Sequence, residues 1–178
     1  MNIWLTSDFH FNHDKEFVWK DRGFSSVYEM NEALIENFNE YVNNDDEVYI
    51  LGDIIMGRDI EAGINLIKKL NGSKILIYGN HDTDNKLNDF KKERVFSDIS
   101  IGERFRLHKI PVLLTHYPTL VENFNKLDMI NFHGHTHSKN KFSNINGAYH
   151  VGVDAHECKP VNLETAYAEL KEYINATR

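Results

Sequence analysis

The sequence EVYILGD, at residues 47–53, places a glycine and an aspartate directly after a short apolar run. A run of this length, bounded by a glycine, predicts a buried strand. The same arrangement occurs earlier in NIWLTSDFH, residues 2–10, and later in KILIYGNHD, residues 74–82. In open α/β sheets ligands bind beyond the carboxyl ends of the strands, so these three segments predict one shared site.

Two segments with helical periodicity lie between the three runs. Ser26–Val42 and Asp59–Leu70 carry apolar residues at three- and four-residue intervals, which predicts amphipathic helices. Ser25 or Ser26 is the expected N-cap of the first helix, and Asn71-Gly72 ends the second. The first half of the chain is therefore predicted to be a βαβ arrangement, with strands at Asn2–Ser7, Glu47–Leu51 and Lys74–Tyr78.

Short apolar runs with brief connections occupy the second half of the chain, which predicts further strands. Lys109-Ile110-Pro111 is the expected turn of a hairpin, and Asn140–Gly147 is an expected polar loop. Asn162–Ala176 has the spacing of a closing amphipathic helix. The strands of this half are expected at Val95–Ile99, Glu103–His108, Val112–Thr115, Met129–His133 and Tyr149–Val153.

The composition and charge of the chain bound its class. With 178 residues and no internal repeat or linker, we expect one domain over residues 1–178. Basic residues number 20 against 27 acidic ones, which gives a net charge of −7, and they form no block. Because affinity for nucleic acids comes mainly from lysine and arginine on phosphates, no long nucleic acid is expected as a partner.

The sequence also carries an expectation about the cellular compartment. Cys158 is the only cysteine, which excludes an intrachain disulfide and leaves a packing role. The first residues reach Asp8 without the basic and apolar regions of a signal peptide. No run approaches the length of a membrane span. We therefore expect a cytoplasmic protein with no membrane association.

The polar residues after the predicted strands are carboxylates, an amide and imidazoles, which are the groups that bind divalent cations. Asp8 and His10 are two residues apart, so in an extended segment their side chains point to the same side. The carboxylate of Asp53 has two oxygens and can bridge two metals. Each motif alone is typical of a turn or a surface residue, but their joint occurrence favours a metal site. The candidate ligands are Asp8, His10, Asp53, Asn80, His116, His135 and His137.

The order of these motifs resembles a known family, the calcineurin-like metallophosphoesterases. The family pattern is Asp-x-His, Gly-Asp, Gly-Asn-His-Asp/Glu, an isolated His and Gly-His-x-His, and all five blocks occur in order between Asp8 and His137. Ser-Asp-Phe-His-Phe-Asn-His near the start, with His116-Tyr117-Pro118 later, is similar to a compact bacterial and phage branch of the family. The resemblance implies an α/β (α+β) fold, a four-layer αββα sandwich of two mixed β-sheets flanked by helices.

The resemblance also implies roles for the motif residues. Two divalent metal ions are expected, Mn first and Fe, Zn, Ni or Co as alternatives, with a bridging hydroxide that attacks phosphorus. His81 would be the general acid, or a hydrogen-bond donor in the transition state, and Asp82 would orient it. The first metal would be held by Asp8, His10 and His137, the second by Asn80, His116 and His135, and Asp53 would bridge them.

Two further residues near the first motif are candidates for substrate binding. His13 lies three residues after His10, and Arg22 suits a bidentate contact to phosphate. A solvated loop position is the alternative for each. The similar branch often has Arg-Pro-Phe where this chain has Arg22-Gly23-Phe24, so the loop is expected to differ there.

These observations favour an enzyme that hydrolyses a small phosphorylated substrate: a phosphodiester, a nucleotide or a phosphomonoester. One alternative is a nuclease that acts on ends or short oligonucleotides, which the acidic balance disfavours. The other is a non-catalytic metal-binding interaction module, which the complete ligand set and His81 disfavour. The oligomeric state and the choice between monoester and diester are left open.

Overall fold

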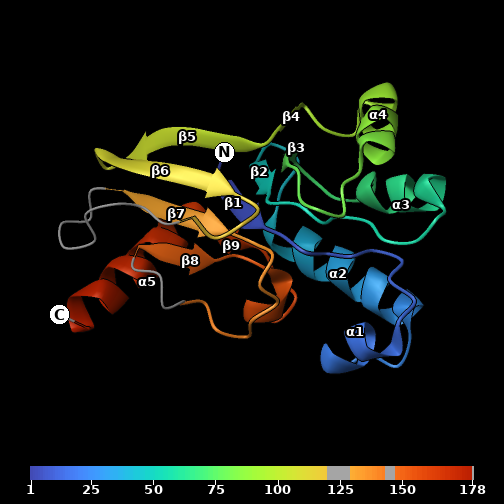
Figure 1. Cartoon of the computed structure of the whole chain (residues 1–178), viewed down its shortest axis with the longest axis horizontal. Coiled ribbons are helices and arrows are strands. Elements are labelled where there is room, and N and C mark those ends of the chain that lie inside the picture. Colours follow the sequence, from blue (N-terminus) through green and yellow to red (C-terminus); the bar gives the residue numbers. More distant parts are fainter. Residues whose placement is uncertain (120–128, 143–146, 178) are drawn as a thin grey trace.

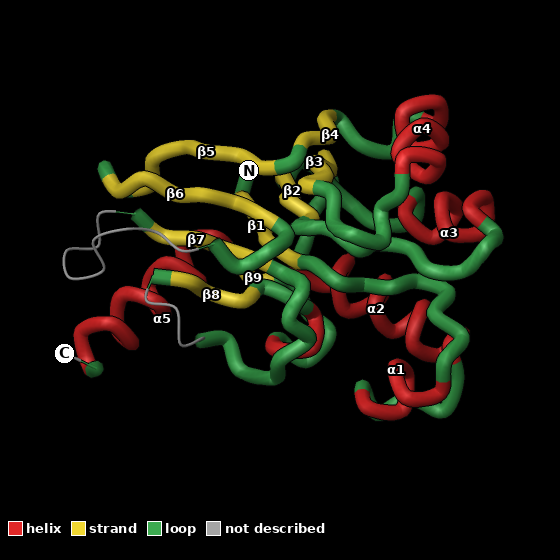
Figure 2. The backbone as a smooth tube through the Cα atoms, viewed as in Figure 1, coloured by secondary structure: helices red, strands yellow, loops and turns green. Residues whose placement is uncertain are grey.

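The computed structural model describes residues 1–119, 129–142 and 147–177. Two β-sheets lie beside each other, with helices α1 to α4 next to one sheet and α5 at the other end of the molecule (Figure 1). The backbone trace shows the same arrangement by element type (Figure 2). The predicted class, two mixed sheets flanked by helices, is confirmed.

The first sheet has five strands in the order β4-β3-β2-β1-β9. Strands β1 to β4 are parallel, and only β9 runs antiparallel, against β1. The three predicted strands of the βαβ half therefore lie side by side in one sheet. The bounds are β1 Ile3–Thr6, β2 Glu47–Ile50, β3 Ser73–Ile77, β4 Asp98–Ser100 and β9 Val161–Asn162.

The second sheet has four strands in the order β5-β6-β7-β8. Strand β5 runs antiparallel to β6, whereas β6, β7 and β8 are parallel to one another. Each sheet thus contains a parallel block, so the carboxyl ends within a block lie on the same side. The bounds are β5 Gly102–Leu107, β6 Ile110–Thr115, β7 Ile130–His133 and β8 Ala148–His150.

The helices pack where the apolar spacing predicts. Helix α2, Val27–Tyr41, begins at the expected cap Ser26, whose hydroxyl accepts from the Glu29 amide. Its buried face joins α3, α4 and the outer face of the first sheet in one apolar core. The remaining bounds are α1 Glu16–Asp21, α3 Ile60–Ile67, α4 Asp84–Glu93 and α5 Leu163–Ala176.

A second apolar core lies between the sheets and also holds α5. Leu5 and Ile77 of the first sheet share it with Val112 and Phe132 of the second, all fully buried. Helix α5 contacts β1, β8 and β9. The two sheets are therefore fixed to each other, which fixes the spacing between the residues at their strand ends.

Several predicted boundaries differ from the structure. The hairpin turn lies at His108 and Lys109, both with positive φ, so Ile110 and Pro111 belong to β6 rather than to the predicted turn. Helices α1 and α4 and strand β9 were not predicted. The predicted loop 140–147 is described only in part, because residues 143–146 lie outside the described residues. No helix among the described residues is long and apolar enough to cross a membrane.

Candidate metal centre

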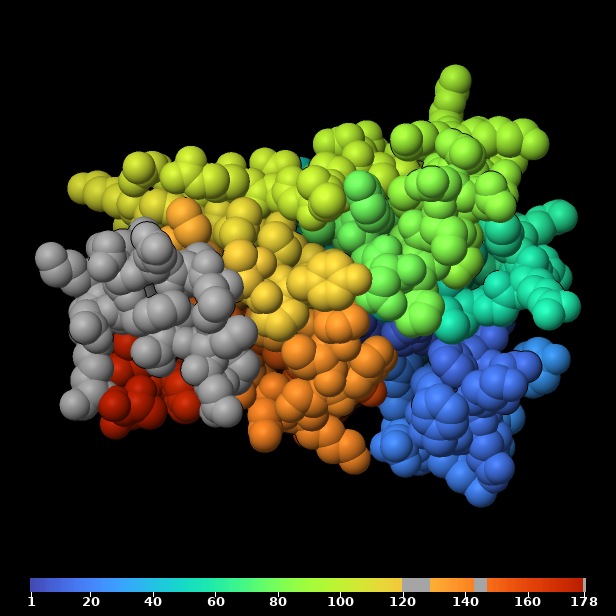
Figure 3. Space-filling view, viewed as in Figure 1, coloured from blue at the N-terminus to red at the C-terminus, as the bar shows by residue number. Residues whose placement is uncertain are grey.

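All seven predicted ligands come together at the carboxyl ends of the two parallel blocks. They form two groups of potential ligand atoms, Asp8, His10 and His137 in one and Asp53, His116 and His135 in the other, with atoms inside each group within 4.8 Å. Asn80 joins the second group through its Oδ1, 2.9 Å from His116 Nε2. On the face in Figure 3, atoms of the N-terminal segment (blue) lie near later segments of the chain (green and orange).

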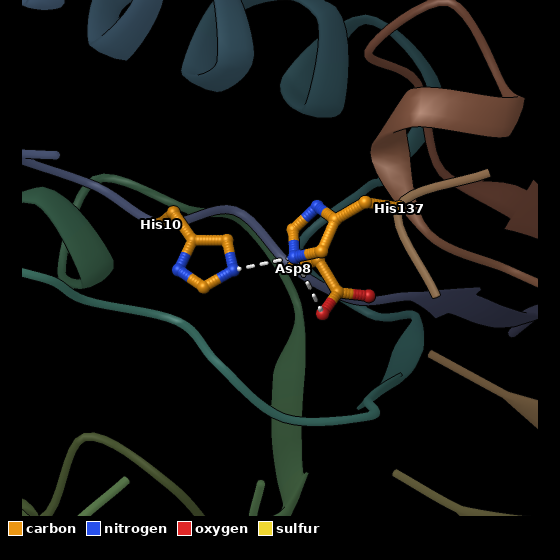
Figure 4. A group of neighbouring side chains, drawn as sticks. All are labelled: Asp8, His10 and His137. Atoms are coloured by element: carbon orange, nitrogen blue, oxygen red, sulfur yellow. Dashed lines mark hydrogen bonds and ion pairs between the residues drawn. The ribbon is translucent and has the colours of Figure 1, made fainter. Parts of the chain in front are cut away.

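The side chains of the first group point towards one another from loops far apart in the sequence (Figure 4). The Nε2 atoms of His10 and His137 are 3.1 Å apart. His137 Nε2 is also 3.9 Å from an oxygen of Asp8. Asp8 and His10 are buried, whereas the side chain of His137 is 45% exposed, so the group opens to solvent on one side.

Asp53 links the second group to the first. Oδ2 of Asp53 is 3.5 Å from Nε2 of His116 in the second group and 3.8 Å from Nε2 of His10 in the first. His135 Nδ1 lies 3.2 Å from His116 Nε2. One fully buried carboxylate therefore stands between two sets of imidazoles, as a bridging ligand requires.

The spacing of these donor atoms fits divalent cations. Ligand bonds of ~2.1 Å place neighbouring ligands of an octahedral ion ~3.0 Å apart, and those of a tetrahedral ion somewhat further. The distances of 3.1, 3.2 and 2.9 Å between facing donors lie in this range. The donors are carboxylate and amide oxygens and imidazole nitrogens, a mixed set that first-row divalent ions accept.

Burial also favours cations at these positions. In the metal-free site, burial raises the pKa of Asp8 to about 6, although a hydrogen bond from Ser7 opposes this shift. Burial, helped by the nearby His137, lowers the pKa of His10 to about 2. The imidazole of His10 is thus neutral and has a free lone pair, and a cation would compensate the buried charge of Asp8.

The backbone at the ligands is not extended. Asp8, His10, His135 and His137 all have positive φ, between 49° and 70°, so the prediction that Asp8 and His10 project from an extended segment is wrong. The pairs converge because sharp turns follow β1 and β7. Asp53 also has positive φ, at 55°. Non-glycine residues adopt this conformation rarely and at a cost, and such residues cluster at functional sites.

A close approach of two loops requires glycine at position 134. A Cβ there would lie 2.7 Å from Oδ2 of Asp8, closer than real Cβ atoms come. Because that space is free, the amide of His135 donates to the same oxygen at 2.9 Å. The turn after β7 is thereby tied to the turn after β1, which brings the two halves of the first group together.

Hydrogen bonds fix the orientation of two imidazoles. Nδ1 of His116 is 2.8 Å from the carbonyl oxygen of Leu51, and Nδ1 of His137 is 2.8 Å from Oδ2 of Asp154. Carbonyl and carboxylate oxygens accept, so Nδ1 is the donor in each ring, and in the neutral imidazole the lone pair on Nε2 is then available to the site. The hydrogen bond to Asp154 raises the pKa of His137 despite burial. Asp154 follows β8, so every strand of both parallel blocks except β4 is followed by a residue of the site.

The guanidinium of Arg22, which is expected to contact phosphate, is bound by groups of the protein. Its side chain is 3% exposed and pairs with Asp154 through Nε at 2.8 Å and Nη2 at 3.1 Å. The guanidinium also donates to the carbonyl oxygens of Asp8 at 2.7 Å and Phe9 at 2.8 Å. The expected phosphate contact is therefore not supported, because these N–H groups already hold the first metal-ligand turn.

Asp82 also differs from its expected role. Its Oδ2 accepts from the amides of Asp53 at 2.7 Å and Gly79 at 2.9 Å, and it makes no described hydrogen bond to the His81 ring. Burial raises the pKa of this carboxyl, while these backbone hydrogen bonds lower it. Asp82 thus ties the turn after β2 to the turn after β3 instead of orienting the imidazole.

His81 lies beside the two groups without belonging to either. Its side chain is 44% exposed, and Nε2 is 4.0 Å from Oδ2 of Asp53. The amide of His81 donates to Oδ1 of Asp53, and the ammonium of buried Lys86 holds the His81 carbonyl at 2.7 Å. His81 and His13 both line a cavity next to the first ligand group, and the ring of His13 is 5.8 Å from that of His10. The backbone of His81 is therefore fixed while its ring faces the opening.

Sequence reasoning missed Asp154 and Lys86. Asp154 comes directly after the predicted strand Tyr149–Val153, which is the signal that identified the ligands. Its partner Arg22 is 132 positions away, and nothing local in the sequence indicates that pair. Lys86 lies in an unpredicted helix, so its burial had no sequence signal.

We expect Asp154→Asn to weaken Mn²⁺ binding by ~10- to 100-fold, because the amide does not fix the His137 tautomer as a carboxylate does. Isothermal titration of metal-free protein with Mn²⁺ measures this change. Asp45→Asn, at an exposed position, is the matched control. An unchanged Kd in folded Asp154→Asn protein would contradict the positioning role.

Comparisons with known proteins agree with this geometry. The model of the calcineurin-like phosphoesterase superfamily domain matches residues 1–153. The uncharacterized protein MJ1445 of Methanocaldococcus jannaschii is 33% identical over 171 residues, 91% of this chain and 87% of the relative. The gene 66 protein of Mycobacterium phage D29 is 30% identical over 200 residues, 98% of this chain and 96% of the relative. The crystal structure of AQ665 from Aquifex aeolicus, of unknown function, shares the fold, with a TM-score of 0.71 at 22% identity over 95% of this chain and 98% of that one.

The fold and the paired ligand groups define a metal-dependent hydrolase of phosphoric esters. The family match covers most of the chain, and the archaeal and phage relatives span nearly its whole length. The chain belongs to the calcineurin-like phosphoesterase superfamily. The family predicted from the five motifs, and an enzyme that hydrolyses phosphoesters, are thus confirmed.

Proposed function

We propose that this protein is a binuclear metal-dependent phosphoesterase that hydrolyses a small phosphodiester, nucleotide or phosphomonoester. The observation that carries the proposal is the position of Asp53, whose Oδ2 lies between His116 of one ligand group and His10 of the other. A shared carboxylate between two three-residue groups suits two cations close together. Two divalent cations, when bound, would supply a water of lowered pKa and neutralise the phosphoryl oxygens.

The residues around the two ligand groups have different roles in the proposed reaction. Seven ligands would hold the cations: Asp8, His10 and His137 the first, Asn80, His116 and His135 the second, and Asp53 would contribute to both. His81 Nε2 projects beside Asp53 into the cavity that opens on the first group, so it is placed to donate a proton to the leaving oxygen. Asp154 and Asp82 keep the ligand turns in place, and the His13 ring is available to the substrate.

The mixed nitrogen and oxygen ligands accept several first-row ions, and we expect Mn²⁺ before Fe, Zn, Ni or Co. The proposal is tested by a screen of phosphorylated substrates, each with several added metals, alongside elemental analysis of the purified protein. We expect about two metal ions per chain in the active samples. One bound ion per chain at full activity would contradict the binuclear site.

His81→Ala is expected to keep its metal content while kcat falls by ~10²- to 10⁴-fold. The reason is that the ring lies outside both ligand groups but faces the cavity. The loss should be smaller for nitrophenyl esters, because nitrophenolate leaves without protonation. His108→Ala is the matched control, since that side chain is 56% exposed and pairs with Glu164. Loss of metal in His81→Ala would show that His81 is a ligand.

Small phosphoesters are expected to be hydrolysed better than long DNA or RNA, because the net charge is −7. A polymer binder with several phosphate contacts loses affinity steeply with salt, ~0.9 log units per contact per log unit of salt. The check is kcat/KM for a small diester and for oligonucleotides at two salt concentrations. Efficient, strongly salt-dependent cleavage of the oligonucleotides would favour the nuclease alternative instead.

A further inference from the structure

A cavity of about 240 Å³ opens next to the first ligand group. His10 and His137 contribute ligand side chains to its wall, and His81 lines it as well. His13 and Phe17, the latter in helix α1, line it as well. A phosphoester whose phosphate lies at the ligand groups therefore has an adjoining space for its organic part.

The aromatic ring of Phe17 lines this space and is unusually exposed. Its side chain is 67% exposed, although phenylalanine is one of the residues most often buried. The ring meets that of His13 edge to face, with centroids 5.8 Å apart, and His13 meets His10 in the same way at 5.8 Å. In the fully described helix α1 no residue is buried, so packing within the protein does not account for the exposed ring.

We infer that this cavity binds the base of a nucleoside phosphoester, stacked on Phe17. The inference rests on the proposed phosphoesterase function. Bases stack readily on exposed aromatic rings. Asp21 and Lys139 also line the cavity and offer an acceptor and a donor to the edge of a base, which an alkyl chain would leave unpaired. The volume lies below the usual ~300–1,000 Å³ of ligand pockets, so it suits one nucleoside rather than an oligonucleotide.

The test compares substrates that differ only in the base. Adenosine 5′-monophosphate is paired with ribose 5-phosphate, and the 5′-methyl phosphodiester of adenosine with the methyl ester of ribose 5-phosphate. Phosphate release, or methanol release for the diesters, gives kcat/KM with Mn²⁺ present. We expect a preference of ~10-fold or more for at least one base-containing substrate, expressed mainly in KM.

Variants assign that preference to Phe17. In Phe17→Ala and Phe17→Leu the preference for the base should fall to about one, whereas Phe17→Trp should retain it. Tyr28→Ala removes another exposed ring, 78% exposed and outside the cavity lining, and should leave the preference unchanged. Equilibrium binding of adenosine 5′-monophosphate to metal-free protein, by isothermal titration, should weaken in Phe17→Ala to the same extent as KM rises.

The outcomes separate this inference from the proposed function. Hydrolysis of base-containing and base-free substrates with equal kcat/KM overturns the nucleoside site and leaves the phosphoesterase intact. A preference that survives Phe17→Ala also overturns it. Failure to hydrolyse any phosphoester of the screen, with metals bound, overturns the proposed function itself.

Discussion

Removal of divalent cations is expected to abolish phosphoester hydrolysis, and added Mn²⁺ is expected to restore it. The converging residues are of the types that bind divalent cations, and a water activated by such cations would lie beside His81. The cations would supply both the nucleophile and several kcal/mol of charge stabilisation, and each 1.36 kcal/mol is tenfold in rate, so a loss of ~10⁴-fold or more is expected. Activity is followed after chelation and gel filtration, with metal content verified by elemental analysis.

The control separates loss of metal from loss of fold. The two apolar cores contain none of the seven ligands, so the circular dichroism of the metal-free protein should stay that of a folded α/β protein. Readdition of Mn²⁺ should then restore activity without a refolding step. Full hydrolysis by protein shown to be free of metal would refute the metal mechanism.

Asp53→Asn is expected to damage the site more than the loss of any terminal ligand. Its Oδ2 lies between the two groups, so a neutral amide in its place should weaken both metal positions. The amide retains an oxygen that accepts from the His81 amide, so the turn after β3 keeps its hydrogen bond. We expect fewer than one ion per chain and a loss of activity close to that of the chelated enzyme. Elemental analysis and kcat/KM at saturating metal are the measurements.

His137→Ala is the matched comparison, because His137 belongs to the first group alone. It should retain one ion per chain where Asp53→Asn retains less. Asp45→Asn controls for the loss of a carboxylate at an exposed position. If Asp53→Asn bound two ions per chain, Asp53 would not be the bridging ligand.

Much of this architecture could be predicted because short apolar runs end at polar motifs. That pattern located β1, β2 and β3 and all seven residues that converge. Helix α4 escaped prediction because only Leu87 and Phe90 among its ten residues are buried apolar side chains. Strand β9 has two residues and is defined by its pairing with β1. Such elements depend on tertiary contacts, which local periodicity does not contain.

The residues that orient the ligands could not be predicted either, because their partners are distant in the sequence. The arginine expected to meet phosphate instead pairs with a carboxylate from the opposite half of the chain, Asp154. The carboxylate of Asp82, expected to orient the imidazole of His81, instead accepts hydrogen bonds from backbone amides. A motif indicates which residues meet at a site, but the tautomers, turns and hydrogen bonds that orient them arise from segments that are distant in sequence. The positive φ of Asp8 and His10 is compatible with their residue types, because Asp and His are enriched at positive φ, but the types alone do not fix that conformation.

The order of the strands has a consequence for how the protein is made. Asp8, His10, Asp53 and Asn80 emerge from the ribosome early, whereas His116, His135 and His137 follow β6 and β7. The pairing of β1 with β9 also forms late, because β9 comes just before α5 in the sequence. Neither proposed ligand group is therefore complete until the chain has been synthesised past His137, so cations would bind a folded site rather than the nascent βαβ half.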